Sequence, residues 1–298
     1  MATTSQLSPD EASAADLLVG LALTEDLGTS GDLTALATIP AAARGRARLV
    51  SRDDGVIAGL PVAAQLAARM GLAEGWTELV GDGSRVRPST PIASVSGPIQ
   101  TLLAFERTAL NFLQHLSGVA TLTARYVDAV AGTGAAILDT RKTLPGWRLL
   151  DKYAVRCGGG RNHRVGLFDA VLIKDNHLAW LAHEGDPVGR AVAAARAFAP
   201  AGTVVEVEVD TLDQLDRAIA SRPDIVLLDN FEATMTREAV RRRDAAAPSI
   251  ALESSGGVTL ATVRALAESG VERISVGALT HSAPALDIGL DFEEWVGP

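Results

Sequence analysis

The sequence is poor in cysteine, in aromatic side chains and in long apolar runs. Cys157 is the single cysteine among 298 residues, so no disulfide can form within the chain, and we expect it to pack as a small residue ahead of three glycines. This excludes a disulfide-stapled secreted fold and makes the cytoplasm the expected location. The first residues have no basic stretch ahead of an apolar one, which argues against a signal or transit peptide. No run reaches the roughly 18 apolar residues that a membrane span needs, so no membrane partner is expected.

The hydrophobic content of 47% is high enough to bury one large core or two modest ones. Because aromatic residues make up only 4% of the chain, the core must be built from Ala, Val, Leu and Ile. Ala-rich helices packed on Val- and Ile-rich strands are typical of an α/β layer architecture.

From about residue 121 onward, short β-branched runs alternate with Ala-rich stretches of helical length. Helices are expected at about 122–131, 187–199, 211–221, 234–246 and 258–269, and the strand candidates read AAILD, AVLIKD, TVVEVEVD, DIVLLDN, IALESSGG and RISVGA. This alternation predicts a parallel sheet, either as a βα barrel, complete or short of eight strands, or as a flat doubly wound sheet. The glycine-rich stretches lack the G-x-G-x-x-G signature of a dinucleotide-binding fold.

The residues before about 118 follow a different pattern. The short strand candidates RGRARLV, GVIAG and PIASVSG are separated by GDGSRVRPSTP, which is typical of turns in an antiparallel sheet. We therefore expect a domain boundary near residue 118, with a helix over 99–118 joining the two halves. Its predicted apolar face holds Leu102, Ala109, Phe112, Leu113 and Leu116, and Arg107 alone would be an ordinary surface arginine.

Positive charge is concentrated in one segment of an otherwise acidic chain. Residues 139–177 hold eight Lys or Arg against four Asp, a net charge of +4, in a chain whose net charge is −9. A solvated helix face is the ordinary explanation for such a run, but here AVLIKDNH leads a strand directly into Lys174. A local positive field in an acidic protein suits a small polyanionic ligand better than a nucleic acid, which needs a long basic surface. No nucleic-acid partner is expected.

If the second half is a barrel, its active site belongs at the carboxyl ends of the strands. The residues at these positions are Asp139, Thr140, Arg141, Lys142, Lys174, Asp175, Glu206, Glu208, Asp210, Asp229, Asn230, Ser254 to Gly257, and Gly277. SSGG and SVGA each lead into an expected helix, so backbone N–H groups there could hold a phosphate. Glu208 and Asp229 form a hard-oxygen pair suited to Mg²⁺, with an ion pair to the basic loop as the competing interpretation. Arg141 and Arg164 suit a planar diacid, and Lys142 suits a phosphate.

The segment LDTRKTLPGWRLLDKYAVRCGGGRNHRVGLFDAVLIKDNH closely resembles quinolinate phosphoribosyltransferases. The resemblance continues through VEVEVD, LLDN, LESSGGV and SVGALTHS, and includes EDLGTSGDLT and FERTALNFLQHLSGVAT in the first half. It implies an incomplete parallel α/β barrel beside an N-terminal α+β open sandwich. The domains would be 1–118, 119–280, and a tail at 281–298 that returns to the first domain.

The same resemblance implies a reaction and a set of binding residues. Quinolinate and 5-phosphoribosyl-1-diphosphate would give nicotinate mononucleotide, diphosphate and CO₂, with Mg²⁺ required, in de novo NAD biosynthesis. The resemblance implies a homodimer, with a higher homo-oligomer as the alternative, in which Arg107 reaches quinolinate from the partner subunit. The implied quinolinate-binding residues are Arg107, Thr140, Arg141, His163, Arg164 and Lys174. The implied phosphoribosyl diphosphate-binding residues are Lys142, Glu208, Asp229, Ser255, Gly256, Gly257, Val276, Gly277 and Ala278, with Lys142 and Lys174 catalytic and Glu208 and Asp229 holding the metal.

Three alternatives stay open from the residues alone. The first is a nicotinate phosphoribosyltransferase, which has a similar barrel but uses a monoacid as substrate. The second is a related enzyme that acts on another aromatic acid. The third is a non-catalytic sensor that binds a phosphate ligand on the same scaffold. The several cations aimed at one small ligand favour the diacid.

Overall fold

The computed structural model describes residues 6–296, which form two compact units. The first unit contains residues 6–124, 143–159 and 279–296, and the second contains 125–142 and 160–278. The expected domain division at residues 118 and 280 stays a prediction. Within the described residues, no helix has the length and apolar character needed to cross a membrane.

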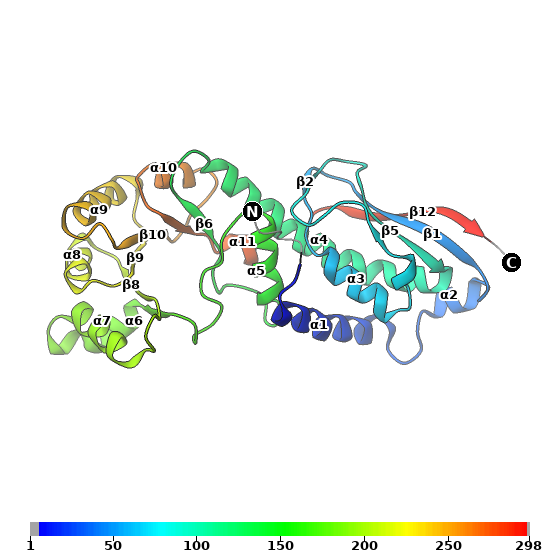
Figure 1. Ribbon diagram of the computed structural model, residues 1–298, viewed down its shortest axis with the longest axis horizontal. Helices are drawn as coiled ribbons and strands as arrows, with labels where there is room; N and C mark the ends of the chain where they lie inside the picture. The colour runs from blue at the N-terminus through cyan, green and yellow to red at the C-terminus, as the bar shows by residue number, and fades with distance from the viewer. Residues whose placement is uncertain (1–5, 297–298) are drawn as a thin grey trace. The chain divides into compact units, whose positions relative to one another are not determined.

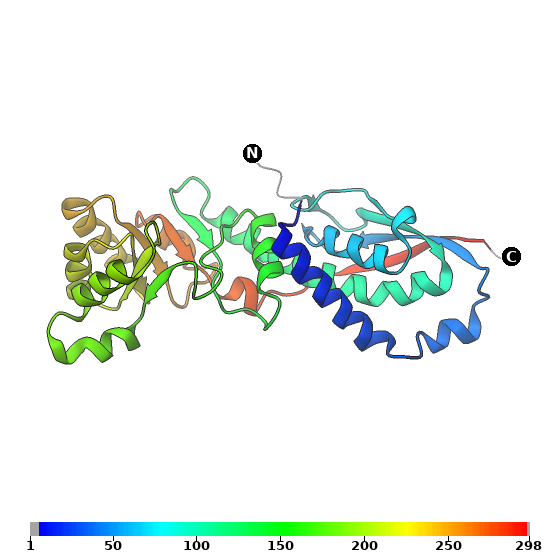
Figure 2. The same cartoon turned by 60° about the horizontal axis from the view of Figure 1, so that its bottom comes forward.

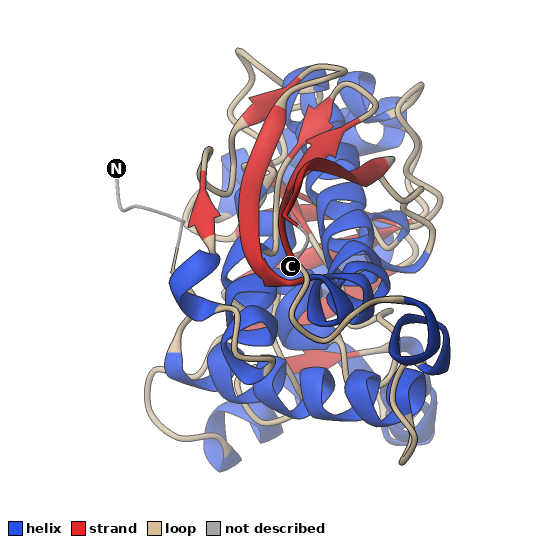
Figure 3. Ribbon diagram, turned by 90° about the vertical axis from the view of Figure 1, so that its right-hand side faces the viewer, coloured by secondary structure: helices blue, strands red, loops and turns tan. Residues whose placement is uncertain are grey.

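The first unit is built on an antiparallel sheet with the strand order β12-β1-β5-β3. Its strands are β1 (Arg44–Ser51), β3 (Thr77–Glu78), β5 (Pro91–Pro98) and β12 (Ile288–Val296), and Figure 3 shows strands in red beside helices in blue. The strand β12 pairs along the whole of β1, from Ser51 opposite Ile288 to Arg44 opposite Val296. Residues near the end of the described chain therefore complete a sheet that begins near its start.

Helices cover this sheet because their apolar faces match it. The core joins sheet residues such as Leu49, Ile92 and Ile288 to Leu60 of α3 (Leu60–Arg69) and Leu113 of α4 (Ile99–Ala129). The remaining elements of this unit are α1 (Pro9–Leu27), α2 (Leu33–Thr38), the short ribbon of β2 (Gly55–Val56) and β4 (Arg85–Val86), and α5 (Arg148–Cys157).

The helix α4 is longer than the sequence indicated. The two expected helices at 99–118 and 122–131 are one continuous helix of 31 residues, because no residue between them breaks the hydrogen bonding. Its predicted apolar face is confirmed, because the five side chains assigned to it are at most 2% exposed: Leu102, Ala109, Phe112, Leu113 and Leu116. Arg107 is exposed. Gly118 allows a close approach here: a Cβ at this position would lie 2.2 Å from the carbonyl oxygen of Pro284.

The loop before α5 is fixed to α4 by aromatic packing. The Trp147 ring stacks on Phe112 with 5.1 Å between ring centroids and meets His115 edge to face at 5.0 Å. The His115 ring in turn lies 2.7 Å from a carboxylate oxygen of the buried Asp151. Cys157, at the end of α5, is buried and free of any disulfide, as expected.

The second unit is a six-stranded parallel sheet with the order β6-β11-β10-β9-β8-β7. The strands are β6 (Ala136–Leu138), β7 (Val171–Ile173), β8 (Val205–Val209), β9 (Ile225–Asp229), β10 (Ala251–Ser255) and β11 (Arg273–Ser275). All six predicted strands are present, and the sheet has its two edges at β6 and β7 within residues 6–296. The α/β class with a parallel sheet and a separate antiparallel sheet is confirmed.

Helices connect successive strands of this sheet. They are α6 (Asp175–Leu181), α7 (Pro187–Phe198), α8 (Leu212–Ser221), α9 (Ala233–Ala246) and α10 (Val263–Ala267), and Figures 1 and 2 show α7, α8 and α9 along the outer side of the strands. The helix expected over 258–269 is wrong in its bounds, because residues 258–262 form an irregular stretch and a turn before α10. The helix α11 (Ala278–His281) has only four residues.

Candidate active site

The polar residues predicted at the strand ends follow or terminate strands of a single parallel sheet. Asp139 to Lys142 follow β6, Lys174 follows β7, Glu206 and Glu208 lie in β8, Asp229 ends β9, Ser255 ends β10, and Val276 and Gly277 follow β11. Because these strands are parallel neighbours, their carboxyl ends lie at one edge of the sheet. The second unit therefore carries all the predicted site residues except Arg107, which belongs to the first unit.

The segment containing His163 reaches this edge by pairing with β6. Arg161 forms a parallel bridge with Leu138, in which its N–H donates to the Ile137 carbonyl at 2.8 Å. The buried Asp139 carboxylate then accepts the backbone N–H of His163 at 2.8 Å and the side-chain amide of Asn162 at 2.6 Å. One carboxylate thus fixes the loop after the glycines against the carboxyl end of β6.

The positive charge of Arg141 acts on Arg164. Burial lowers the pKa of Arg164, and the positive charge of Arg141 lowers it further. The Arg164 guanidinium also donates to the Ala170 carbonyl at 3.2 Å. Two neighbouring cations repel each other unless an anion lies between them, so this part of the site suits a ligand with several negative charges.

The carboxylates on β8 and β9 form a second group. The Lys174 ammonium lies 2.6 Å from Glu208, so the ion pair that the sequence allowed is present. Burial raises the pKa of Asp229, and the negative charges of Glu208 and Asp210 raise it further. Several carboxylates close to one another supply hard oxygen donors, which fit Mg²⁺.

The turn after β10 is held in a conformation that suits glycine. Gly256 and Gly257 have φ values of +85° and +57°, and a Cβ on Gly256 would lie 2.2 Å from the side-chain oxygen of Asn230. Asn230 itself has φ +56°, and its N–H donates to the Ser255 carbonyl at 2.9 Å. These left-handed turns lie side by side because β9 and β10 are neighbours.

The expectation that the turn after β10 leads directly into a helix is wrong. Since α10 begins at Val263, no helix N-terminus follows Gly257 directly, and only backbone N–H groups of the turn could bind a phosphate. The N–H of Val276 donates to the Leu138 carbonyl at 2.9 Å, so that donor is used within the sheet.

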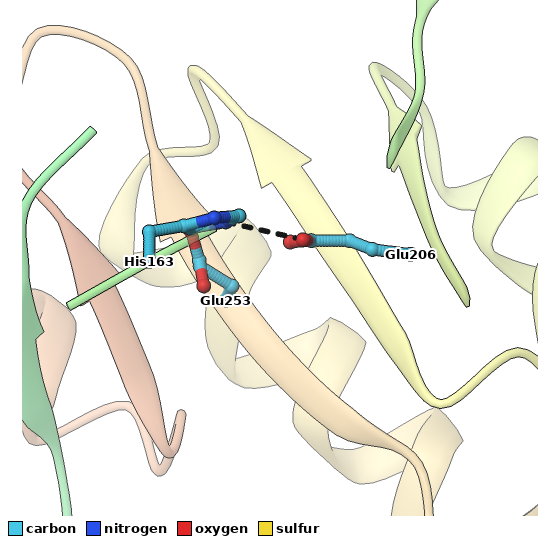
Figure 4. A group of neighbouring side chains, drawn as sticks. All are labelled: His163, Glu206 and Glu253. Atoms are coloured by element: carbon cyan, nitrogen blue, oxygen red, sulfur yellow. Dashed lines mark ion pairs between the residues drawn. The ribbon is translucent and has the colours of Figure 1, made fainter. Parts of the chain in front are cut away.

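A buried cluster lies in the same sheet around His163. Its Nε2 is 3.1 Å from a Glu206 oxygen and 3.4 Å from a Glu253 oxygen, and the three side chains are between 0% and 7% exposed (Figure 4). Arg273 donates to the other Glu253 oxygen at 2.6 Å. Burial alone would lower the pKa of His163, but the two carboxylates outweigh it and raise the pKa to about 9.

Sequence reasoning named His163 and Glu206 but not Glu253 and Arg273. Both lie within strand candidates, inside IALESSGG and RISVGA. A charged residue within an apolar strand run was the signal that could have identified Glu253, because such a residue must be paired when it is buried.

Comparisons with known proteins show the family of this chain. Family models described as quinolinate phosphoribosyl transferase match the chain over residues 32–117 (N-terminal domain) and 119–291 (C-terminal domain). The chain belongs to the quinolinate phosphoribosyl transferase family.

Members of this family from distant organisms match most of the chain. Nicotinate-nucleotide pyrophosphorylase (carboxylating) of Mycobacterium leprae (strain TN) is 48% identical over 287 residues, covering 96% of this chain and 99% of that protein. Quinolinate phosphoribosyltransferase (decarboxylating) 1 of Nicotiana glauca is 39% identical over 296 residues, covering 93% of this chain and 81% of that protein. The solved structure of nicotinate-nucleotide pyrophosphorylase from Francisella tularensis has a TM-score of 0.86 at 38% identity and covers 97% of this chain and 98% of its own.

Proposed function

We propose that this protein transfers the phosphoribosyl group of 5-phosphoribosyl-1-diphosphate to quinolinate with loss of CO₂. The products are nicotinate mononucleotide and diphosphate, and the step serves de novo NAD biosynthesis in the cytoplasm. Family membership supports the reaction class. The single structural observation that carries the choice of a diacid is that Arg141 follows β6 while Arg164, next to the buried His163, lies on the segment that pairs with β6.

In this proposal the cations bind quinolinate. Arg141 and Arg164 each offer a planar fork that matches a carboxylate two oxygens at a time. The other proposed contacts are Thr140, His163, Lys174 and Arg107. Two carboxylates on one small ring explain why so many donors gather in a chain of net charge −9.

The phosphoribosyl diphosphate lies over the carboxyl ends of β8 to β11 in this arrangement. Lys142 faces the diphosphate as a point charge, and its own N–H donates to Thr140 Oγ1 at 3.0 Å, which fixes the loop that carries it. Ser255, Gly256, Gly257, Val276, Gly277 and Ala278 form the two turns around the 5′-phosphate. Glu208 and Asp229 would hold Mg²⁺, which supplies positive charge to the diphosphate when it is bound.

The chemistry needs positioning and charge more than a nucleophilic side chain. As the bond from the anomeric carbon to the diphosphate breaks, the leaving group takes the electron pair and Lys142 stabilises its charge. The pyridine nitrogen, aligned by the arginine forks, forms the new bond to the anomeric carbon. The ring nitrogen is then cationic, so it stabilises the electron pair left on C2 when the adjacent carboxylate leaves as CO₂.

Lys174 is the proposed source or relay of the proton that replaces CO₂ on C2. Its side chain is 47% exposed and paired with the buried Glu208, so it can move to a bound substrate once a cation held by Glu208 takes its place. The proton lost by Lys174 is regained from water.

An assay with both substrates tests the proposal. Quinolinate labelled at the 2-carboxylate is incubated with phosphoribosyl diphosphate, with and without Mg²⁺, and nicotinate mononucleotide and labelled CO₂ are measured. We expect equal amounts of both, only with the metal. If nucleotide forms from nicotinate but not from quinolinate, the substrate is a monoacid and not the proposed diacid. If diphosphate is released with neither acid, the proposal that the protein is this enzyme is overturned.

A further inference from the structure

His163 lies between two carboxylates that the reaction itself does not require. Its Nε2 is within 3.4 Å of an oxygen of both Glu206 and Glu253, from β8 and β10. The second oxygen of Glu253 is anchored by Arg273 on β11. Three strands of the sheet therefore fix one imidazole ring.

The charges around the ring favour its protonated form. Burial favours the neutral acid of Glu253, but His163 and Arg273 outweigh it and lower the pKa of this carboxyl, which favours its ionised form, whereas burial raises the pKa of Glu206. If the His163 ring is neutral, the carboxyl groups of Glu206 and Glu253 have only Arg273 as a positive partner, below a site that is proposed to bind the quinolinate dianion. A proton on His163 balances this buried charge and removes the repulsion. The charged and titratable groups around the ring are Glu206, Glu253, Arg273, Asp139, Arg164 and, next to Arg164, Arg141.

The other ring nitrogen points to a role in binding. Nδ1 accepts the backbone N–H of Arg164 at 2.7 Å, which requires that Nδ1 carry no proton. When the ring is protonated this bond is lost, and the Nδ1–H and the Arg164 N–H become two neighbouring donors. A carboxylate oxygen can accept both, and charge-assisted bonds of this kind are stronger than the neutral bond they replace.

We propose that Glu253, anchored by Arg273, is a positioning residue that, together with Glu206, keeps His163 protonated for quinolinate binding. The inference rests on the proposed function only in naming the ligand. A metal ion on His163, Glu206 and Glu253 is the competing use of the same atoms. It is disfavoured because a metal needs an unprotonated Nε2, whereas the two carboxylates beside this atom favour a proton on it.

The charge of His163 can be measured without any activity. The chain has five histidines, so ring ¹⁵N spectra of histidine-labelled protein are simple, and His163→Asn identifies the His163 signals. We expect His163 to titrate near pH 9 in the wild type. In Glu253→Gln we expect the pH at which His163 titrates to fall by roughly 1–2 units, because an opposite charge within about 6 Å is removed.

Two further variants separate this effect from a general loss of structure. Glu272→Gln breaks a different ion pair in the same unit, with Arg243 at 2.9 Å, and should leave the His163 titration unchanged. Arg273→Met removes the cation that pairs with Glu253 and should not lower the pH at which His163 titrates. A variant of Glu253 that merely loosens the fold would not produce these opposite results.

The kinetic test uses the Michaelis constants for the two substrates. The wild-type KM for quinolinate should be flat from pH 7 to pH 8, whereas in Glu253→Gln it should rise by up to about tenfold per pH unit above the lowered titration point, as the protonated fraction falls. The KM for phosphoribosyl diphosphate should not follow this trend. A neutral His163 at pH 7 in the wild type, an unshifted titration in Glu253→Gln, or stoichiometric Zn²⁺ bound at the ring would each overturn the proposal. If the spectra agree but quinolinate is not a substrate, the proposed function fails and the charge assignment stands.

Discussion

At the scale of single residues, the pairing of Lys174 with Glu208 joins a proposed quinolinate contact to a proposed metal ligand. Their side chains lie 2.6 Å apart, so a change in one alters the charge seen by the other. A ligand that draws Lys174 away frees Glu208 to bind a cation. Binding of the acid and of the metal–diphosphate complex should therefore assist each other.

The role of Lys174 is tested by Lys174→Met. Loss of a positioned proton donor should lower the rate of CO₂ release by roughly 10²-fold or more. Single-turnover measurement of labelled CO₂ checks this, with both substrates shown to bind by calorimetry. Full-rate decarboxylation with normal binding would remove Lys174 from the chemistry.

At the scale of elements, a capping box and an ion pair hold the start of α1 against α5. Ser8 accepts the N–H of Glu11 at 3.3 Å and donates its own N–H to the Glu11 carboxylate at 2.8 Å. Arg156 of α5 lies 2.9 Å from the same carboxylate. Burial alone would raise the pKa of Glu11, but the bonds from Arg156 and Ser8 outweigh it and lower the pKa.

This depressed pKa predicts a pH dependence of stability. A carboxylate whose pKa is lower in the folded state stabilises the fold above its ordinary pKa of 4.5 and loses that effect as pH falls through the lowered value. Glu11→Gln should therefore unfold at a lower temperature than the wild type at pH 7, and the gap should shrink on going from pH 5 to pH 3. Thermal unfolding in this range is the measurement, and a gap that is constant with pH would contradict the assignment.

The turn after β10 predicts the effect of Gly256→Ala. The added Cβ would lie 2.2 Å from the Asn230 side chain at a φ of +85°, so the turn must shift. We expect a loss of stability of about 1–3 kcal/mol and a clear rise in the KM for phosphoribosyl diphosphate. Gly134→Ala is the matched control, since its Cβ meets nothing within 4 Å, and equal behaviour of the two variants would argue against a phosphate-binding turn.

The elements differ in how well the sequence predicted them. The six strands of the parallel sheet were found because each is a short β-branched or apolar run, as in DIVLLDN, and these runs alternate with stretches of helical length. The helix α1 was missed because its burial does not follow an apolar stripe: Leu17 and Leu21 are exposed, while Glu11 is buried. Lys142, Glu208 and Asp229 could be chosen from strand ends. The sequence marks Glu253 only as a charged residue inside a strand run, and its partner His163 is known from the long-range contact.

At the scale of the whole molecule, the proposed homodimer predicts that two defective chains can restore each other. If Arg107 acts in the partner's site, Arg107→Ala and Lys142→Gln should each be nearly inactive alone. Random pairing after mixed refolding makes half of the dimers mixed, with one intact site each, so about one quarter of wild-type activity should return. If mass spectrometry shows that mixed dimers have formed but no activity returns, Arg107 acts in the site of its own chain or in no site.

The pairing of β1 with β12 has a consequence for synthesis on the ribosome. The strand β1 emerges early, yet its partner β12 follows every other described strand in the chain. Until β12 emerges, the Arg44–Ser51 edge has no neighbour on that side, and an unpaired edge invites aggregation. The parallel sheet from Ala136 to Ser275 can form before this happens. Premature termination shortly before Ile288 should therefore give a product with a foldable barrel and an aggregation-prone first unit.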